Sequence, residues 1–96
     1  MLTRSEILKR ADEIVNGHRE NEYGSPEDNF KLISEFWSSY LGYPVTPEDV
    51  AIMMIFLKIA RIETGIGSAD CWIDIAGYAA CGGEIATKET EAVLDD

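Results

Sequence analysis

Two cations and two carboxylates stand close together in the second half of the chain. Lys58 and Arg61 close an apolar stretch. Asp70 and Asp74 follow a short break that contains glycine. Two carboxylates one helical turn apart can share a Mg²⁺ ion, which keeps other positions for water or phosphate oxygens. Lysine and arginine side chains suit the phosphates themselves. These residue types therefore point to a site for a phosphate-bearing molecule.

A structural role explains the same four residues without a ligand. Two ion pairs would close a hairpin of two helices, and Asp70 would also stabilise a helix N-terminus. Partly buried ion pairs are weak stabilisers, however, because the cost of desolvation offsets their attraction. Charge concentrated on otherwise apolar helices is more typical of a binding or catalytic site. Both interpretations stay open at this point.

A second candidate stretch lies between the first two predicted helices. It contains His18, the only histidine, together with Arg19 and Tyr23. Arg19 suits a phosphate contact, and Tyr23 suits stacking on a base. The simpler interpretation makes His18 a surface residue and Tyr23 a packing residue. No P-loop, CxxC or GxGxxG motif occurs, and the histidine has no identifiable nucleophile partner.

The charge balance restricts the partners. The 96 residues include 8 Lys+Arg and 18 Asp+Glu, which gives a formal net charge of -10. We therefore expect no direct binding to nucleic acid, because its phosphates would be repelled. An acidic chain can instead hold divalent cations, occupy a basic groove of a partner, or simply be well solvated.

Cysteine use and hydropathy predict a soluble cytoplasmic protein. Cys71 and Cys81 fall in one predicted helix, about 15 Å apart along its axis and too far for a disulfide. The N-terminal segment is too charged for a signal peptide. The longest apolar run, residues 50–57, is far shorter than a membrane span, so we expect no membrane association.

Capping residues predict four helices. Three segments place a hydroxyl side chain three residues before an acid, and two of them have proline at the first helical position. The expected helices cover residues 4–16, 26–41, 47–63 and a stretch from about residue 69, with N-caps at Thr3, Ser25, Thr46 and Ser68. The acidic tail, residues 86–96, either extends the last helix or frays. Without a strand pattern or a linker, residues 1–96 should form a single all-α domain that resembles a four-helix bundle.

The third and fourth predicted helices should pack together and against further surface. The third is apolar nearly all round between residues 50 and 57, which is typical of a helix in the middle of a bundle or in an oligomer interface. The fourth carries several alanines and glycines that let another helix approach closely. Four short helices cover this much apolar surface poorly, so we expect at least a homodimer.

The turn between these two helices sets their register. A short connection makes them antiparallel neighbours. With the turn centred near residue 66, Lys58 stands at the height of Asp74, and Arg61 at the height of Asp70. Asp70 and Asp74 share one face, with Tyr78 towards its edge. The sequence therefore predicts a four-residue charged cluster between the helices.

Five short motifs follow one another along the chain. They are Arg19-x-x-x-Tyr23-Gly24, Asn29-Phe30, Lys58-x-x-Arg61, Asp70-x-x-x-Asp74 and Gly77-Tyr78. This ordered set resembles that of a group of small phage and prophage proteins. Those proteins are in turn similar to the MazG-type all-α nucleoside triphosphate pyrophosphohydrolases. The resemblance extends over residues 18–83.

The resemblance implies an oligomeric helical bundle that cleaves a nucleoside triphosphate into monophosphate and pyrophosphate. It makes Asp70 and Asp74 the catalytic carboxylates that hold Mg²⁺, the ion that orients the phosphates and activates water. The substrate contacts that it implies are Lys58, Arg61, Arg19, Tyr23 and Tyr78.

The acidic residues depart from the enzyme pattern. MazG-type enzymes carry ExxE on one helix and ExxD on the next, whereas this chain has DxxxD and no ExxE on the preceding helix. Either Glu35 or Asp49 could complete a metal site, but neither matches the motif.

Three functions agree with these observations, each exerted in the cytoplasm of a host cell. The first is Mg²⁺-dependent hydrolysis of a (deoxy)nucleoside triphosphate, which would adjust nucleotide pools. The second is nucleotide binding without turnover, such as sequestration of a signalling nucleotide of host defence, which the missing ExxE favours. The third is an acidic phage inhibitor of a basic host protein, which the net charge of -10 favours.

Overall fold

Four helices make up the part of the chain that the computed structural model describes, residues 1–17, 25–65 and 67–88. They are α1 (Arg4–Asn16), α3 (Pro26–Leu41), α4 (Pro47–Glu63) and α5 (Ala69–Lys88). No strand occurs in these ranges. The all-α prediction is confirmed, and the predicted bounds of the first three helices agree with the observed ones. The acidic tail continues α5 as far as Lys88, and its remainder lies outside the described residues.

A side-chain hydroxyl caps the N-terminus of each described helix, as the capping pattern predicts. The hydroxyl oxygens of Thr3, Ser25, Thr46 and Ser68 accept hydrogen bonds from the backbone N–H groups of Glu6, Asp28, Asp49 and Asp70 at 3.1, 3.2, 3.1 and 3.2 Å. Two of these caps are reciprocal, because the carboxylates of Glu6 and Asp49 accept from the backbone N–H groups of Thr3 and Thr46. The C-terminus of α3 is closed by Gly42, whose φ of 66° lies in the left-handed region that suits glycine.

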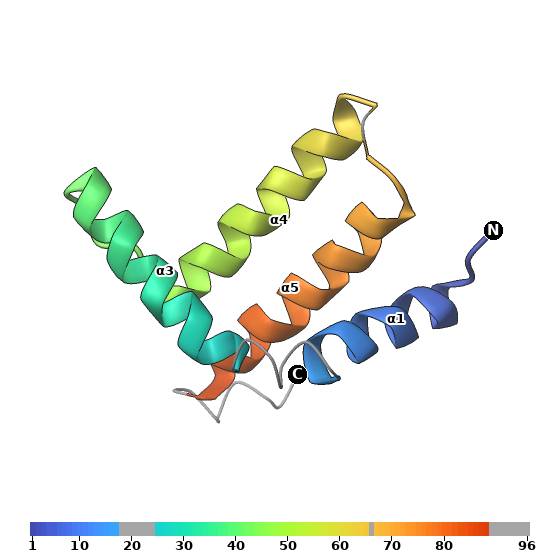
Figure 1. Ribbon diagram of the computed structural model, residues 1–96, viewed down its shortest axis with the longest axis horizontal. Coiled ribbons are helices and arrows are strands. Elements are labelled where there is room, and N and C mark those ends of the chain that lie inside the picture. Colours follow the sequence, from blue (N-terminus) through green and yellow to red (C-terminus); the bar gives the residue numbers. More distant parts are fainter. Residues whose placement is uncertain (18–24, 66, 89–96) are drawn as a thin grey trace.

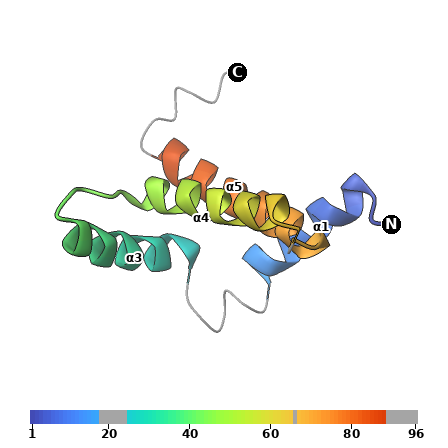
Figure 2. The same cartoon turned by 90° about the horizontal axis from the view of Figure 1, so that it is seen from above.

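An antiparallel pair, α4 and α5, forms the centre of the molecule (Figure 1). Helix α3 packs against α4, and α1 packs against α5. Figure 2 shows that α3 lies on one side of the α4–α5 pair. Among the described helices, none covers the opposite side. The arrangement is therefore open, with α4 and α5 each in contact with described helices over part of their circumference.

The core is small and centres on a close approach between α4 and α5. Val50 and Ala51 are almost completely buried and cluster with Phe30 of α3. A Cβ atom placed on Gly82 would lie 2.8 Å from the Cβ atom of Ala51. Glycine at this position thus lets the two helices come closer than an alanine would allow. On the other side of α5, the side chain of Val15 from α1 lies against Gly77.

The outward half of α4 stays uncovered within one copy of the chain. We use "outer face of α4" for five apolar residues that are each between 41% and 64% exposed: Ile52, Met53, Phe56, Leu57 and Ile59. The sequence allowed two positions for this apolar helix, the middle of a bundle or an oligomer interface. Only the inner side of α4, which carries Val50 and Ala51, is buried as the first position requires.

The remaining expectations concern membranes and cysteines. No helix in the described ranges is long and apolar enough to span a membrane. Cys71 is buried and Cys81 is half-buried, and neither forms a disulfide. The prediction that these two thiols do not pair is confirmed.

Candidate functional site

The centre of the predicted charged cluster is an ion pair between α4 and α5. The Nζ atom of Lys58 lies 3.1 Å from the Oδ2 atom of Asp74, and the two side chains are 19% and 28% exposed. The predicted register, which places Lys58 at the height of Asp74, is confirmed. Because both groups keep some access to water, the pair lies at the surface end of the helix interface and not in the core.

Arg61 and Asp70 lie one turn closer to the α4–α5 connection. Arg61 is three residues after Lys58 and Asp70 is four residues before Asp74, so each lies on the same side of its helix as that neighbour. We call Lys58 with Arg61 on α4, and Asp70 with Asp74 on α5, the charged stripes. Both are exposed, and no ion pair joins Arg61 or Asp70 to another described side chain. The backbone N–H of Asp70 donates to Ser68 Oγ, in the first turn of α5, where a carboxylate is favoured by the helix dipole. The structure thus forms one of the two predicted ion pairs and leaves the other two charges open to solvent.

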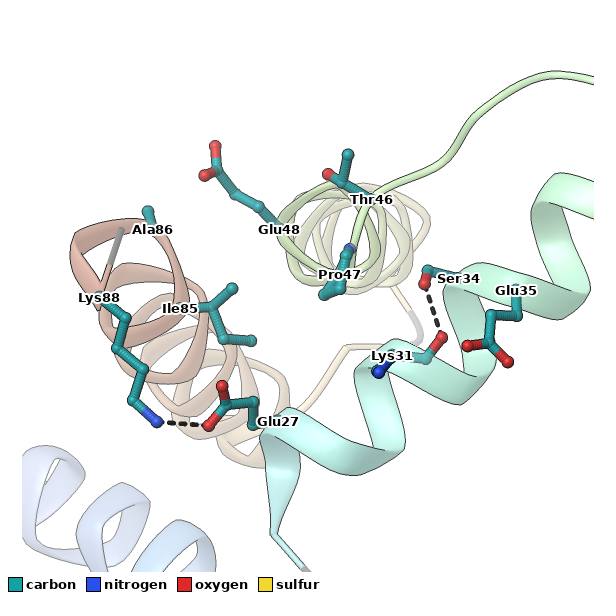
Figure 3. A pocket seen from close by; sticks show the side chains of 10 residues that line it. All are labelled: Glu27, Lys31, Ser34, Glu35, Thr46, Pro47, Glu48, Ile85, Ala86 and Lys88. Atoms are coloured by element: carbon teal, nitrogen blue, oxygen red, sulfur yellow. Dashed lines mark hydrogen bonds and ion pairs between the residues drawn. The ribbon is translucent and has the colours of Figure 1, made fainter. Parts of the chain in front are cut away.

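Glu35 lies elsewhere, in a pocket at the beginning of α4 (Figure 3). It lines this pocket together with Thr46 and Glu48, whereas Lys58 is ten residues beyond Glu48 and roughly 15 Å further along the helix axis. Asp49, the other candidate third ligand, is engaged in the capping hydrogen bonds of α4. Within the described ranges no three His, Cys, Asp or Glu side chains form a group that could hold a metal ion. The predicted set Asp70, Asp74 and Glu35 is therefore not brought together within one copy.

The pocket around Glu35 was not anticipated from the sequence. It has a volume of about 590 Å³ and lies between the N-terminal part of α3, the start of α4 and the end of α5. Lys88 pairs with Glu27 across it, and this hydrogen bond raises the pKa of Lys88 above its ordinary value. The only buried polar side chain among its lining residues, Ser34, donates to the carbonyl oxygen of Lys31 at 2.6 Å. The sequence of α3 shows charged residues of both signs, but this pattern does not by itself predict a pocket.

Tyr78 packs in the helix interface. Its ring lies 6.1 Å from the ring of Phe30, at an interplanar angle of 34°. The residue is half-buried and contacts the core cluster that contains Val50 and Ala51. This contact gives Tyr78 a packing role, alongside the substrate contact that the resemblance implies.

The second candidate stretch is the segment between α1 and α3. His18, Arg19 and Tyr23 lie outside the described residues. The predicted phosphate contact of Arg19 and the predicted base contact of Tyr23 therefore stay predictions.

Comparison with known proteins adds a family to this description. A protein-family model described as "Domain of unknown function (DUF6378)" matches residues 6–86, which include almost all of the described helices. The chain belongs to this family. No solved structure matches the DUF6378 chain.

Two relatives of the DUF6378 chain are phage proteins. The "Gene 55 protein" of Mycobacterium phage L5 is 49% identical over 74 residues, which are 76% of this chain and 47% of the relative. The "Gene 55 protein" of Mycobacterium phage D29 is 41% identical over 75 residues, 78% of this chain and 50% of the relative. The chain thus spans about half the length of these curated relatives. The predicted phage family is confirmed, while none of these comparisons links it to MazG.

Proposed function

We propose that this DUF6378 chain binds a nucleoside triphosphate at the charged stripes of α4 and α5 and hydrolyses it with the help of Mg²⁺. The observation that carries the proposal is the Lys58–Asp74 ion pair at 3.1 Å, which remains 19% and 28% exposed. One turn away on the same stripes, Arg61 and Asp70 are exposed and have no described ion partner. Two positive groups on α4 thus lie beside two negative groups on α5, on a surface that a small molecule can reach.

An exchange of partners connects this geometry to phosphate binding. A phosphate group can replace Asp74 as the ionic partner of Lys58, because a phosphate also carries negative charge and oxygen atoms that accept hydrogen bonds. Asp74 then becomes available, one turn from Asp70. Arg61, whose planar group suits two phosphate oxygens at once, supports the same phosphates. The ion pair seen in the structure is, in this proposal, the resting state of the site.

The acids provide part of what Mg²⁺ needs. The ion is commonly held by one or two carboxylates together with substrate phosphates and water, so Asp70 and Asp74 fit this requirement without a third protein ligand. When bound, Mg²⁺ would supply charge neutralisation at the phosphates and a more acidic water molecule. In the reaction a water oxygen bonds to the α-phosphorus and gives up a proton to the solvent, the bond from the α-phosphorus to the bridging oxygen breaks, and pyrophosphate leaves. The choice of bond follows from the resemblance of the ordered motifs to those of small phage proteins that are in turn similar to MazG-type enzymes.

Binding without hydrolysis is the second candidate function. It is favoured by one specific observation, namely that no group of three potential metal-binding side chains occurs in the described ranges. Lys58 and Arg61 are sufficient for a phosphate contact without metal. In that case the phage protein would hold a nucleotide, such as a signalling nucleotide of the host, and release it unchanged.

Calorimetric titration combined with product analysis separates the two functions. Deoxynucleoside triphosphates and cyclic dinucleotides are titrated in Mg²⁺ and in EDTA, and each mixture is analysed for monophosphate and pyrophosphate. Asp70→Asn and Asp74→Asn should abolish Mg²⁺-dependent turnover, and Lys58→Ala should weaken binding roughly tenfold or more, as expected for loss of a charged hydrogen bond. Glu84→Gln, an exposed acid elsewhere on α5, serves as the control that changes charge without touching the site.

The titration and the product analysis together have three possible outcomes. Turnover in Mg²⁺ that Asp74→Asn removes establishes the hydrolase. Binding in both Mg²⁺ and EDTA, with no product formed in Mg²⁺, establishes the binding protein. If no nucleotide binds, the ion pair is a structural contact and both proposals fail.

A further inference from the structure

We infer that two copies of this chain form a dimer through the outer face of α4. This surface is defined above by Ile52, Met53, Phe56, Leu57 and Ile59. Each of these five apolar residues is at least 41% exposed in a single copy. The inference concerns a different surface from the charged stripes, and it does not depend on nucleotide binding.

The spacing of the five residues produces a continuous apolar surface. Ile52, Phe56 and Ile59 follow one another at intervals of four and three residues, and Met53 with Leu57 forms a second row beside them. Together the rows cover about 160° of the helix at 100° per residue. The two most deeply buried residues of α4, Val50 and Ala51, lie on the inward side. A monomeric protein rarely leaves an uninterrupted apolar patch of this kind in water.

The exposure of these five residues gives a second copy something to bury. Each is at least 41% exposed in one copy, and removal of apolar surface from water is the main favourable term in most protein–protein association. Packing of a second copy on the outer face of α4 would therefore be favourable.

Charge identifies the partner as a second copy. No charged residue belongs to the outer face of α4, and the nearest acids on that side, Asp49 and Glu63, lie beyond its two ends. Two copies that each carry a net charge of -10 repel one another over most of their surface, and an uncharged apolar face is where this repulsion is smallest. A basic partner would instead be drawn to surfaces rich in acids. The uncharged face therefore fits the chain itself.

The symmetry of a dimer gives one residue a special position. Two identical helix faces that pack antiparallel are related by a two-fold axis, so a residue at the axis meets its own copy. Phe56 is the middle residue of the outer face of α4. Phe56 should therefore face Phe56 of the second copy. Lys58 points to the other side of α4, where it pairs with Asp74, so the charged stripes stay accessible.

Sedimentation velocity on the whole chain tests the dimer. The unaltered chain should sediment as a species of twice 10.7 kDa. Phe56→Asp should raise the dissociation constant at least tenfold, because it places a charge in the apolar contact of both copies. Leu8→Asp on α1 is a matched control, since Leu8 and Phe56 are both 64% exposed, and it should leave the dimer intact.

A crosslinking experiment tests the same face independently of affinity. Phe56→Cys should form a disulfide-linked dimer under mild oxidation, whereas Leu8→Cys and the unaltered chain should not. If Phe56→Asp fails to fold by circular dichroism, Met53→Lys replaces it on the same face. A monomer at all concentrations, a dimer unaffected by both charged variants, or a dimer equally lost in Leu8→Asp would each overturn the inference.

Discussion

At the scale of single residues, the ion pair between Lys58 and Asp74 joins α4 to α5 and is the feature on which the proposed function rests. Its two side chains are neither fully buried nor free in water. Exposed pairs contribute little to stability, and buried pairs are costly to break because the remaining charge has no partner. A pair of intermediate exposure contributes modestly to the free energy of unfolding, and loss of one partner lowers that free energy because the other charge is left partly buried. Such a pair can exchange one partner for a ligand at a small cost in stability.

A double-mutant cycle measures that coupling. Lys58→Met and Asp74→Leu should each lower the free energy of unfolding by roughly 1–2 kcal/mol, while the double variant should come close to the unaltered chain. Urea unfolding followed by circular dichroism gives the three differences. Strictly additive effects would show that the two charges do not interact in solution.

Substitution of two adjacent glycines of α5 by alanine should change stability in opposite directions. Gly82→Ala should lower stability by about 1–3 kcal/mol, because the new Cβ atom is forced against a buried neighbour and would lie 2.8 Å from Ala51 Cβ. Gly83→Ala has nothing within 4 Å of the new atom and should raise stability by about 0.5–1 kcal/mol through helix propensity. Thermal unfolding of both variants is the measurement. If both change stability in the same direction, α4 and α5 are not as close as the structure has them.

At the scale of helices, the capping boxes explain why the sequence predicts the bounds so closely. A hydroxyl followed three residues later by an acid is a local signal, and local hydrogen bonds satisfy it. Helix register also proved predictable, because the short turn and two period-3.6 patterns leave one arrangement in which Lys58 meets Asp74. Four elements and one ion pair thus follow from short-range rules.

The rest of the site could not be predicted from such rules. The crossing of α3 over the start of α4 is decided by packing among distant residues, and this crossing moves Glu35 into a separate pocket away from Asp74. The closeness of Gly82 to Ala51 depends on the same long-range fit. Arg61 and Asp70 were expected to pair, yet their side chains end in solvent, where little energy is gained by holding them together.

The first capping box should make α1 sensitive to acid. The backbone N–H and the side chain of Thr3 both form hydrogen bonds with Glu6 and hold the pKa of its carboxyl below the ordinary value. Because the lowered pKa belongs to the folded state, this contribution is present above the ordinary glutamate pKa and is lost as the pH falls through the folded-state value. Glutamine can make the same cap without titrating. Glu6→Gln should therefore reduce the loss of stability on acidification.

Urea midpoints at neutral and acidic pH provide the measurement. Glu13→Gln, an exposed acid of α1 that takes no part in the cap, is the control and should keep the pH dependence of the unaltered chain. Equal pH dependence in Glu6→Gln and the unaltered chain would show that the capping box does not persist in solution.

At the scale of the whole molecule, the net charge of -10 acts on stability. Repulsion among the acids disfavours any compact state, and salt screens it over about 10 Å at 0.1 M. The midpoint of thermal unfolding should rise by a few degrees between low and physiological salt. A triple variant, Glu13→Gln, Glu63→Gln and Glu84→Gln, should unfold at a higher temperature in low salt and respond less to added salt. A salt response that is the same in both proteins would indicate that counterion screening is not the cause.

The placement of α1 beside α5 has a consequence for biosynthesis. Of the described helices, α1 is made before the others, whereas the helix that it packs against is the last. Residues 17–68 must be translated before α5 begins, which takes roughly 3–10 s at about 5–20 residues per second. During this interval the side of α1 that carries Ala11 and Val15 has no docking surface on the nascent chain. Until α5 is made, this side of α1 is accessible to a ribosome-associated chaperone.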